Sequence, residues 1–153
     1  MSGADSSKFL QGQLSNDIEV LRDNNYQYST FSTNQGKVIA SMRIFKRGNQ
    51  YIILTNSDVA NSVLEGLRKY ILMSKVDIRL EHSTCYGVLG NNEINVENIS
   101  TSESQYNLTK INDAYILAVK IIDCPSYIVV SFTDDVPNFL LNDISNDVNI
   151  SKL

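Results

Sequence analysis

Apolar and polar residues alternate through the first third of the chain as they do in an antiparallel sheet with one buried face. Every second residue from Tyr26 to Thr30 suits the same side of a strand, and turn residues separate this stretch from two others. Gly36 and Gly48 can adopt the positive φ that tight turns between such strands require. The pattern predicts an antiparallel meander over 26–56, with strands at 26–32, 37–46 and 50–54.

Apolar residues at helical spacing lie on both sides of this meander. Residues 5–7 offer N-cap side chains for a short helix that ends near 16–17. A longer helix with one apolar face is expected from Ser57 or Asp58 to about Met73. Residues 75–80 have the pattern of an edge strand. Helix, strands, helix and strand in this order predict an α+β fold, with the helices on one face of an antiparallel sheet.

A second and weaker cycle of elements follows. Pro137 lies early in a predicted helix that ends near 145, and the polar stretch 91–105 has room for one short helix. Residues 149–153 have the composition of a strand that is cut off, so we expect the sequence to be the front part of something larger. The candidate strands are 86–89, 107–110, 115–122 and 127–132. We expect a first α+β subdomain over 1–82 and a second, incomplete one over 83–153.

Composition excludes several kinds of chemistry. His82, Cys85 and Cys124 come from three different stretches and supply at most three ligands, so neither a zinc or iron site nor a disulfide scaffold is expected. No apolar run approaches the roughly 20 residues of a membrane span, and the first residues lack the pattern of a signal peptide. No nucleophile–base pair is visible, so the pattern gives no catalytic residue. We expect a soluble, cytoplasmic protein without a metal centre.

Charge is unevenly distributed along the chain. Residues 37–79 carry a net charge of +5 and the remaining residues −9, which gives the net charge of −4. A face built to meet an anion would explain this asymmetry, and so would the ordinary solvated faces of two strands and a helix. A pI near 4.9 and the lack of interleaved aromatic and basic residues argue against a dedicated nucleic-acid binder, so no direct DNA binding is expected.

Four segments, in order and at matching spacing, carry a resemblance to a known family. The first runs from Gly3-Ala4-Asp5 through Gln11-Gly12-Gln13 to Asn16-Asp17, and the others cover 35–45, 67–72 and 74–76. Together they resemble the amino-terminal part of YgfZ-type folate-binding proteins, which are relatives of the glycine-cleavage T-protein, an aminomethyltransferase. The resemblance covers residues 3–82 well and continues loosely to about 145.

The resemblance implies a GcvT/YgfZ-like folate-binding fold, in which three small domains form a ring around tetrahydrofolate. In this chain the ring would be incomplete. In YgfZ proteins the scaffold assists the maintenance of iron–sulfur enzymes, including tRNA-modifying ones, whereas the T-protein transfers a one-carbon unit to folate. The implied cofactor is therefore tetrahydrofolate, and the implied protein partners are iron–sulfur enzymes.

The resemblance also implies a folate site made of Tyr28, Ser41, Arg43 and Asn56. Tyr28 corresponds to a T-protein tyrosine that lines the pocket, and Asn56 to a pocket asparagine. Ser41 stands two residues before Arg43, where the T-protein has an aspartate that meets the folate nitrogen accepting the carbon. A serine hydroxyl is neutral and cannot supply that carboxylate charge, which disfavours aminomethyl transfer. A flat ligand needs an aromatic wall and a few polar partners at its edge, and this set offers both.

Each of these residues also has an ordinary structural explanation. Tyr28, Ser41 and Arg43 suit plain strand positions, and Asn56 suits the turn before a helix. Asn16 suits the end of the first helix, although its amide could also face the folate. The Lys-Gly-Cys-aromatic-x-Gly-Gln motif of YgfZ proteins is absent, since the chain has no Lys-Gly pair. The strand that precedes the Gly3 segment in the family is missing too.

The sequence is compatible with three functions. The first is a YgfZ-type tetrahydrofolate-binding protein without independent catalysis. The second is an interaction-only relative that docks an acidic protein or RNA through the basic segment 37–79. The third is an aminomethyltransferase-like enzyme in which another residue replaces the aspartate missing at Ser41.

Overall fold

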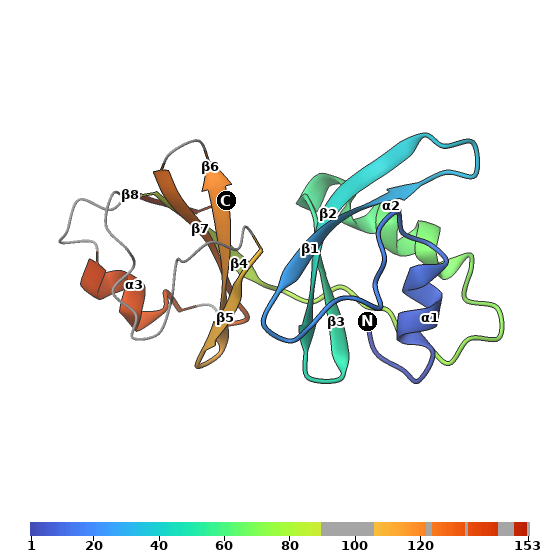
Figure 1. Cartoon of the computed structure of the whole chain (residues 1–153), viewed down its shortest axis with the longest axis horizontal. Coiled ribbons are helices and arrows are strands. Elements are labelled where there is room, and N and C mark those ends of the chain that lie inside the picture. Colours follow the sequence, from blue (N-terminus) through green and yellow to red (C-terminus); the bar gives the residue numbers. More distant parts are fainter. Residues whose placement is uncertain (90–105, 122–123, 134, 144–148, 153) are drawn as a thin grey trace. The chain divides into compact units, whose positions relative to one another are not determined.

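The computed structural model describes residues 1–89, 106–121, 124–133, 135–143 and 149–152 of the 153-residue chain (Figure 1). The chain divides into two compact units, Met1–Glu81 and His82–Leu153. Each unit is built on one antiparallel sheet, with short helices against it. The predicted α+β class is therefore confirmed.

The first unit contains a three-stranded sheet in the order β1-β2-β3, as the alternation of the sequence predicts. Gly36 has φ 83° and Gly48 has φ 59°, so both turns use the backbone freedom of glycine as expected. The elements of this unit are α1 (Ser6–Gln11), β1 (Tyr26–Ser32), β2 (Val38–Arg47), β3 (Gln50–Leu54) and α2 (Ser57–Arg68).

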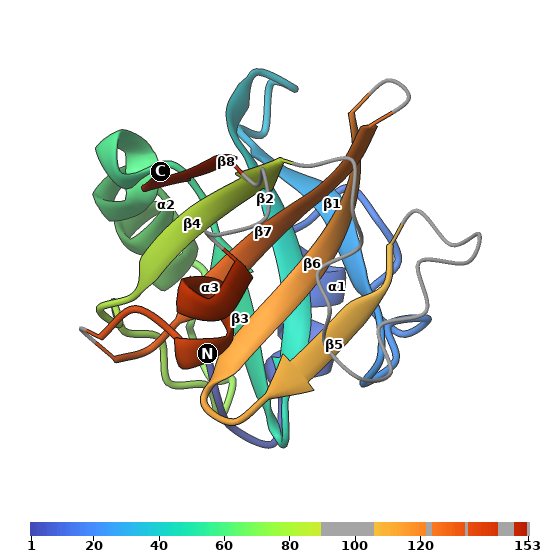
Figure 2. The same ribbon diagram turned by 90° about the vertical axis from the view of Figure 1, so that its left-hand side faces the viewer.

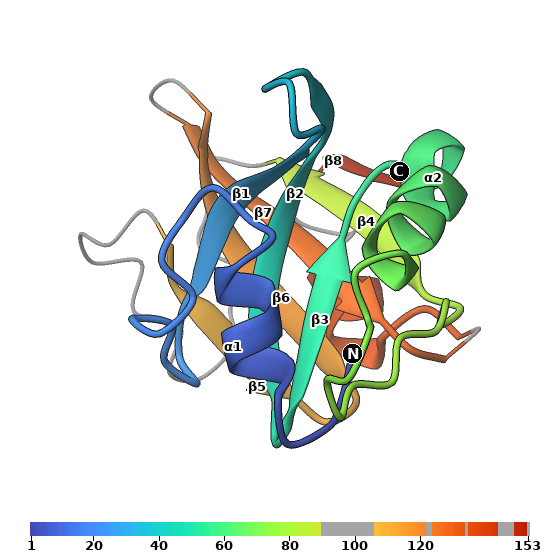
Figure 3. The same ribbon diagram turned by 90° about the vertical axis from the view of Figure 1, so that its right-hand side faces the viewer.

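Both helices of the first unit lie on one face of its sheet (Figure 3). Their buried residues form a single apolar core with alternate residues of the strands, because successive strand residues point to opposite faces. Gly66 permits α2 to approach β1 closely: a Cβ at this position would lie 2.6 Å from Cε1 of Phe31. The core includes Phe9, Leu10, Leu14, Phe31, Met42, Ile44, Tyr51, Val63 and Leu67.

The predicted helix ends need correction. The first helix stops at Gln11, and its N-cap residue Asp5 makes no side-chain cap. The second is capped by Asn56 rather than by Ser57 or Asp58. It ends at Arg68 rather than near 73, because the backbone closes tight i→i+3 turns there. The apolar spacing continues past this end because Ile71 still packs on the core from a turn.

Residues 75–80 do not form the predicted edge strand. They contribute one isolated antiparallel bridge, in which Asp77 exchanges backbone hydrogen bonds with Ser2. Gly3, with φ 122°, lies so close to this segment that a Cβ would overlap the carbonyl oxygen of Lys75. No longer ladder forms because the partner of this segment is the short stretch 1–5 before α1, in which Ser2 pairs with Asp77 while Met1 pairs with Tyr51 of β3.

The second unit contains a five-stranded antiparallel sheet in the order β5-β6-β7-β4-β8, with α3 across one face (Figure 2). Leu140 of α3 belongs to a core cluster with Ile116 and Val129. The strand bounds of β4 to β7 differ from the predicted ones by at most three residues, while the stretch 91–105 lies outside the described residues. The elements are β4 (Thr84–Leu89), β5 (Leu108–Ile111), β6 (Ala114–Ile121), β7 (Cys124–Ser131), α3 (Asn138–Asp143) and β8 (Asn149–Lys152).

Candidate functional site

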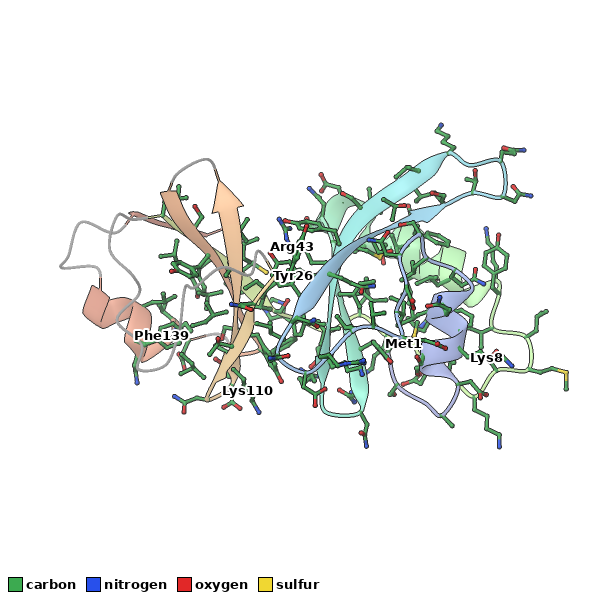
Figure 4. The ribbon with its side chains drawn as sticks, viewed as in Figure 1. Met1, Lys8, Tyr26, Arg43, Lys110 and Phe139 are labelled. Atoms are coloured by element: carbon green, nitrogen blue, oxygen red, sulfur yellow. The ribbon has the colours of Figure 1, made fainter. Side chains whose placement is uncertain are left out.

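The site residues implied by the resemblance lie in the first unit, and three of them share the sheet face turned away from α1 and α2. Arg43 and Tyr26 mark this face in Figure 4. Tyr26 and Tyr28 alternate along β1, and Ser41 and Arg43 along β2, so all four project to the same side. The register sets Tyr28 directly opposite Arg43 and Thr30 opposite Ser41.

Tyr28 and Arg43 form a direct pair across the two strands. The Tyr28 hydroxyl oxygen accepts hydrogen bonds from Nε of Arg43 at 3.1 Å and from Nη2 at 2.9 Å. The guanidinium carbon also lies 4.7 Å from the centre of the Tyr28 ring, within the range of a cation–π contact. Tyr26 packs edge-on against Tyr28, with 5.8 Å between ring centres. The arrangement fixes a positive charge beside an aromatic surface.

Ser41 lies within β2, and Asn56 lies two residues beyond the end of β3. Arg43 is paired with Leu54, so the chain beyond Leu54 runs back alongside Ser41. Thr55 donates a hydrogen bond from Oγ1 to the Ser41 carbonyl at 3.0 Å, and the Ser41 side chain is exposed. Asn56 accepts a hydrogen bond at Oδ1 from the Asp58 backbone N–H at 2.9 Å, which leaves its amide N–H groups as the part able to meet a ligand.

Asn16, in the loop after α1, contacts the backbone of β1 at Tyr28, a contact that its position in the sequence does not predict. Its Nδ2 donates to the Tyr28 carbonyl at 2.7 Å. Next to it, Ser15 exchanges hydrogen bonds with Thr30: the Ser15 N–H donates to the Thr30 carbonyl, and the Thr30 N–H donates to Ser15 Oγ. The free edge of β1 is therefore closed by this loop at the level of Tyr28. The sequence offered one indication of this contact, because a side-chain amide such as that of Asn16 can donate to an unpaired carbonyl at a strand edge.

The four implied residues supply a cation, a phenol, a hydroxyl and an amide, which are groups able to bind a flat polar ligand. Across the described residues, no cluster of three or more His, Cys, Asp or Glu could hold a metal ion. None of the described helices is long and apolar enough to cross a membrane.

Several known proteins are similar to this chain in sequence, although no protein-family model matches the chain. An uncharacterized protein of Haemophilus influenzae is 35% identical over 91 residues, which are 59% of this chain and 32% of that protein. A tRNA-modifying protein YgfZ from Photorhabdus laumondii is 33% identical over 92 residues, or 60% of this chain and 28% of the relative. Over the matched residues, the chain is homologous to proteins named tRNA-modifying protein YgfZ. Another such protein, from Hamiltonella defensa, is 31% identical over 84 residues, 55% of this chain and 25% of the relative.

The fold has a solved counterpart. The glycine cleavage system aminomethyltransferase T from Bartonella henselae matches 95% of this chain and 42% of its own chain, with a TM-score of 0.75 and 11% sequence identity. The resemblance to YgfZ proteins and the GcvT-like fold, both predicted from the sequence, are therefore confirmed. The matched segment covers only about a quarter to a third of the length of these curated relatives.

Proposed function

We propose that this chain is the folate-binding part of a YgfZ-type protein, which binds tetrahydrofolate and assists the maintenance of iron–sulfur enzymes in the cytoplasm, tRNA-modifying enzymes among them. The observation that carries the proposal is the Tyr28–Arg43 pair on the face of the sheet away from the helices, in a chain homologous to YgfZ proteins. A ring of the pterin type would stack on the aromatic surface. Ser41 and Asn56 would meet its polar edge.

Arg43 has a specific part in this proposal. Two of its N–H donors are already directed to the Tyr28 hydroxyl, so the guanidinium is held in one orientation before a ligand arrives. A preorganised cation loses less conformational entropy on binding than a free side chain does. Its remaining donors would recognise a carbonyl or carboxylate of the folate.

The test is a thermal melt of the chain with and without a stable reduced folate. At a ligand concentration 100 times Kd, binding adds about 2.7 kcal/mol, a rise in Tm of roughly 5–10 °C for a chain of this size. We expect Arg43→Gln to lose most of the rise. Arg79→Gln, in an exposed position outside the site, is the matched control and should keep it. No rise in the wild-type chain would refute folate binding by this chain.

One-carbon transfer is not part of the proposal. Ser41 places a neutral hydroxyl where the resemblance implies an aspartate, and the exposed side chain has no carboxylate partner among the other three residues of the site. We expect no turnover with an aminomethyl donor. The variant Ser41→Asp tests the point, because turnover that appears only in this variant would show that the missing carboxylate is what removes the reaction.

A further inference from the structure

The loop 69–75, which follows α2, displays two large apolar side chains to solvent. Leu72 is 87% exposed and Met73 is 96% exposed, whereas their neighbour Ile71 is packed on the core. Tyr70 is also exposed, at 47%. Single exposed apolar residues are common on protein surfaces, but two adjacent ones at nearly full exposure form a knob that needs an explanation.

The loop is held at both ends, so the knob is a fixed feature of the first unit. At its start, the Tyr70 and Ile71 N–H groups donate to the carbonyls of Leu67 and Arg68. At its end, Lys75 donates its backbone N–H to Oδ2 of Asp5 at 2.7 Å and accepts a hydrogen bond from the Asp5 N–H at its carbonyl. The loop therefore lies beside α1 (Figures 1 and 3). Anchoring of this kind reduces the entropy lost when the tip is buried by a partner.

Lysine residues flank the knob. Residues 66–76 contain Arg68, Lys69 and Lys75 and no acidic residue, while Glu65 and Asp77 stand just beyond the two ends of this stretch. Lys69 and Lys75 are exposed on the two sides of the apolar pair, and Lys8 on the exposed side of α1 adds a further charge three residues after Asp5 (Figure 4). Arg68 is directed elsewhere, to Glu65 and to the Ile78 carbonyl. A complementary surface would be apolar at its centre and acidic at its rim.

We propose that the loop 69–75 is a docking knob for a protein partner that presents an apolar pocket rimmed by Asp and Glu side chains. The inference takes the class of partner, a client enzyme, from the function proposed above. Burial of two large apolar side chains in one pocket favours association, because their surface is removed from water. RNA offers phosphates to the lysines but no pocket for Leu72 and Met73. A membrane is also a poor fit, because even a whole myristoyl chain, with more carbon than these two side chains, binds a bilayer only marginally.

The proposal can be tested by photo-crosslinking in cells that naturally make the protein, with the full-length protein. A benzophenone amino acid is placed at Leu72 and, as the matched control, at Val20, which is apolar and 56% exposed elsewhere on the unit. We expect Leu72 to give a protein crosslink at least about tenfold stronger than Val20 gives, mapped to a partner peptide with acidic residues beside apolar ones.

Charge reversal then tests whether the crosslink depends on contacts between the lysines of the loop and acidic residues of the partner. Lys69→Glu with Lys75→Glu should reduce the yield at least about tenfold, since like charges across an interface are strongly unfavourable. Lys37→Glu, an exposed turn position, should leave the yield unchanged. Reversing the mapped acids of the partner to Lys should restore binding to the doubly reversed knob. A crosslink to RNA or lipid, a yield no higher than at Val20, or a yield insensitive to the double reversal would overturn the proposal.

Failure of the knob can be distinguished from failure of the folate site. Leu72→Ser with Met73→Ser leaves the core intact, so its Tm should stay within about 2 °C of wild type and its response to folate should be unchanged. A wild-type chain that ignores folate but still crosslinks through Leu72 would refute the folate site and leave the knob standing. A wild-type chain that responds to folate but gives no crosslink through Leu72 would refute the knob alone.

Discussion

The two faces of the three-stranded sheet are made by the same strands and yet carry different kinds of residue. Toward the helices, alternate positions such as Met42 and Ile44 are apolar and belong to one core with α1 and α2. On the other side, the intervening positions bring Arg43 and Ser41 beside Tyr28. The difference shows how period-two alternation lets one strand serve stability on one side and recognition on the other. Tyr26 and Phe45 on this second side are buried as well, at 1% and 0% exposed. Substitutions of core residues such as Ile44 should therefore alter folding, and substitutions of Arg43 or Ser41 should alter binding.

The largest expected effect tests the helix-covered face. Ile44 is fully buried in the core of the first unit. Ile44→Ala removes buried methyl groups and leaves a cavity, which should cost about 2–5 kcal/mol of unfolding free energy. Val38→Ala, on the same strand but 55% exposed, should change it by less than about 0.5 kcal/mol. Urea denaturation measures both, and equal losses in the two variants would contradict the division between the faces.

A second substitution measures how closely the covered face is packed. Gly66→Ala adds a methyl group 2.6 Å from Cε1 of Phe31, a side chain that is 2% exposed. Overpacking of this kind costs about 1–3 kcal/mol, which should exceed the gain of up to about 1 kcal/mol in helix propensity. The expected net result is a lower denaturation midpoint. Gly12→Ala meets only ordinary contacts, the nearest at 3.6 Å, so it should be neutral or stabilising.

Much of this arrangement could be predicted from the sequence, for local reasons. The bounds of β1 and β3 follow from alternation and from the turn glycines, because strand period and turn chemistry are properties of adjacent residues. The end of α2 could not be predicted, since Ile71 keeps the apolar spacing while it packs from a turn. The tight contact of Gly3 with Lys75 joins residues 72 positions apart, and no periodicity reports such a contact.

The residues of the candidate site could be named from the sequence, but the contacts between them could not. Tyr28, Ser41, Arg43 and Asn56 came from resemblance, and whether they bind folate stays a prediction. That Arg43 donates to the Tyr28 hydroxyl depends on the register of β1 and β2. A one-residue slip would place the two side chains on opposite faces, so the pairing emerges only with the fold. The cap by Asn56 is likewise a matter of where α2 begins.

A smaller effect is expected where the site meets the edge of β1. Asn16→Asp keeps the shape of the side chain but replaces the donor to the Tyr28 carbonyl with a carboxylate oxygen, which should cost about 1–2 kcal/mol at pH 7. The pKa of the new carboxyl should rise above its ordinary value of about 3.9 in the folded state, because its neutral form can donate to the carbonyl. The deficit should therefore shrink as the pH falls through that raised pKa, because a group with a raised folded pKa stabilises the fold at low pH.

Urea denaturation of this variant and of wild type at pH 7 and pH 4 measures the change. Asn34→Asp, in an exposed turn, is the matched control for the added charge and should show no comparable difference between the two pH values. A deficit that is the same at both pH values would contradict the hydrogen bond as its cause.

The smallest expected effect on stability concerns the Tyr28–Arg43 pair. Tyr28→Phe removes the hydroxyl that accepts from Nε and Nη2 of Arg43 and keeps the ring beneath the guanidinium. Because the pair is exposed, the loss of unfolding free energy should be below about 1 kcal/mol, and a double-mutant cycle with Arg43→Gln should give a coupling of about 0.5–1 kcal/mol. Tyr70→Phe, another exposed tyrosine, should show no coupling with Arg43→Gln. If the folate-binding proposal holds, Tyr28→Phe should still weaken the ligand-induced rise in Tm, because Arg43 is no longer held in one orientation, and a full rise in this variant would show that the orientation does not matter for binding.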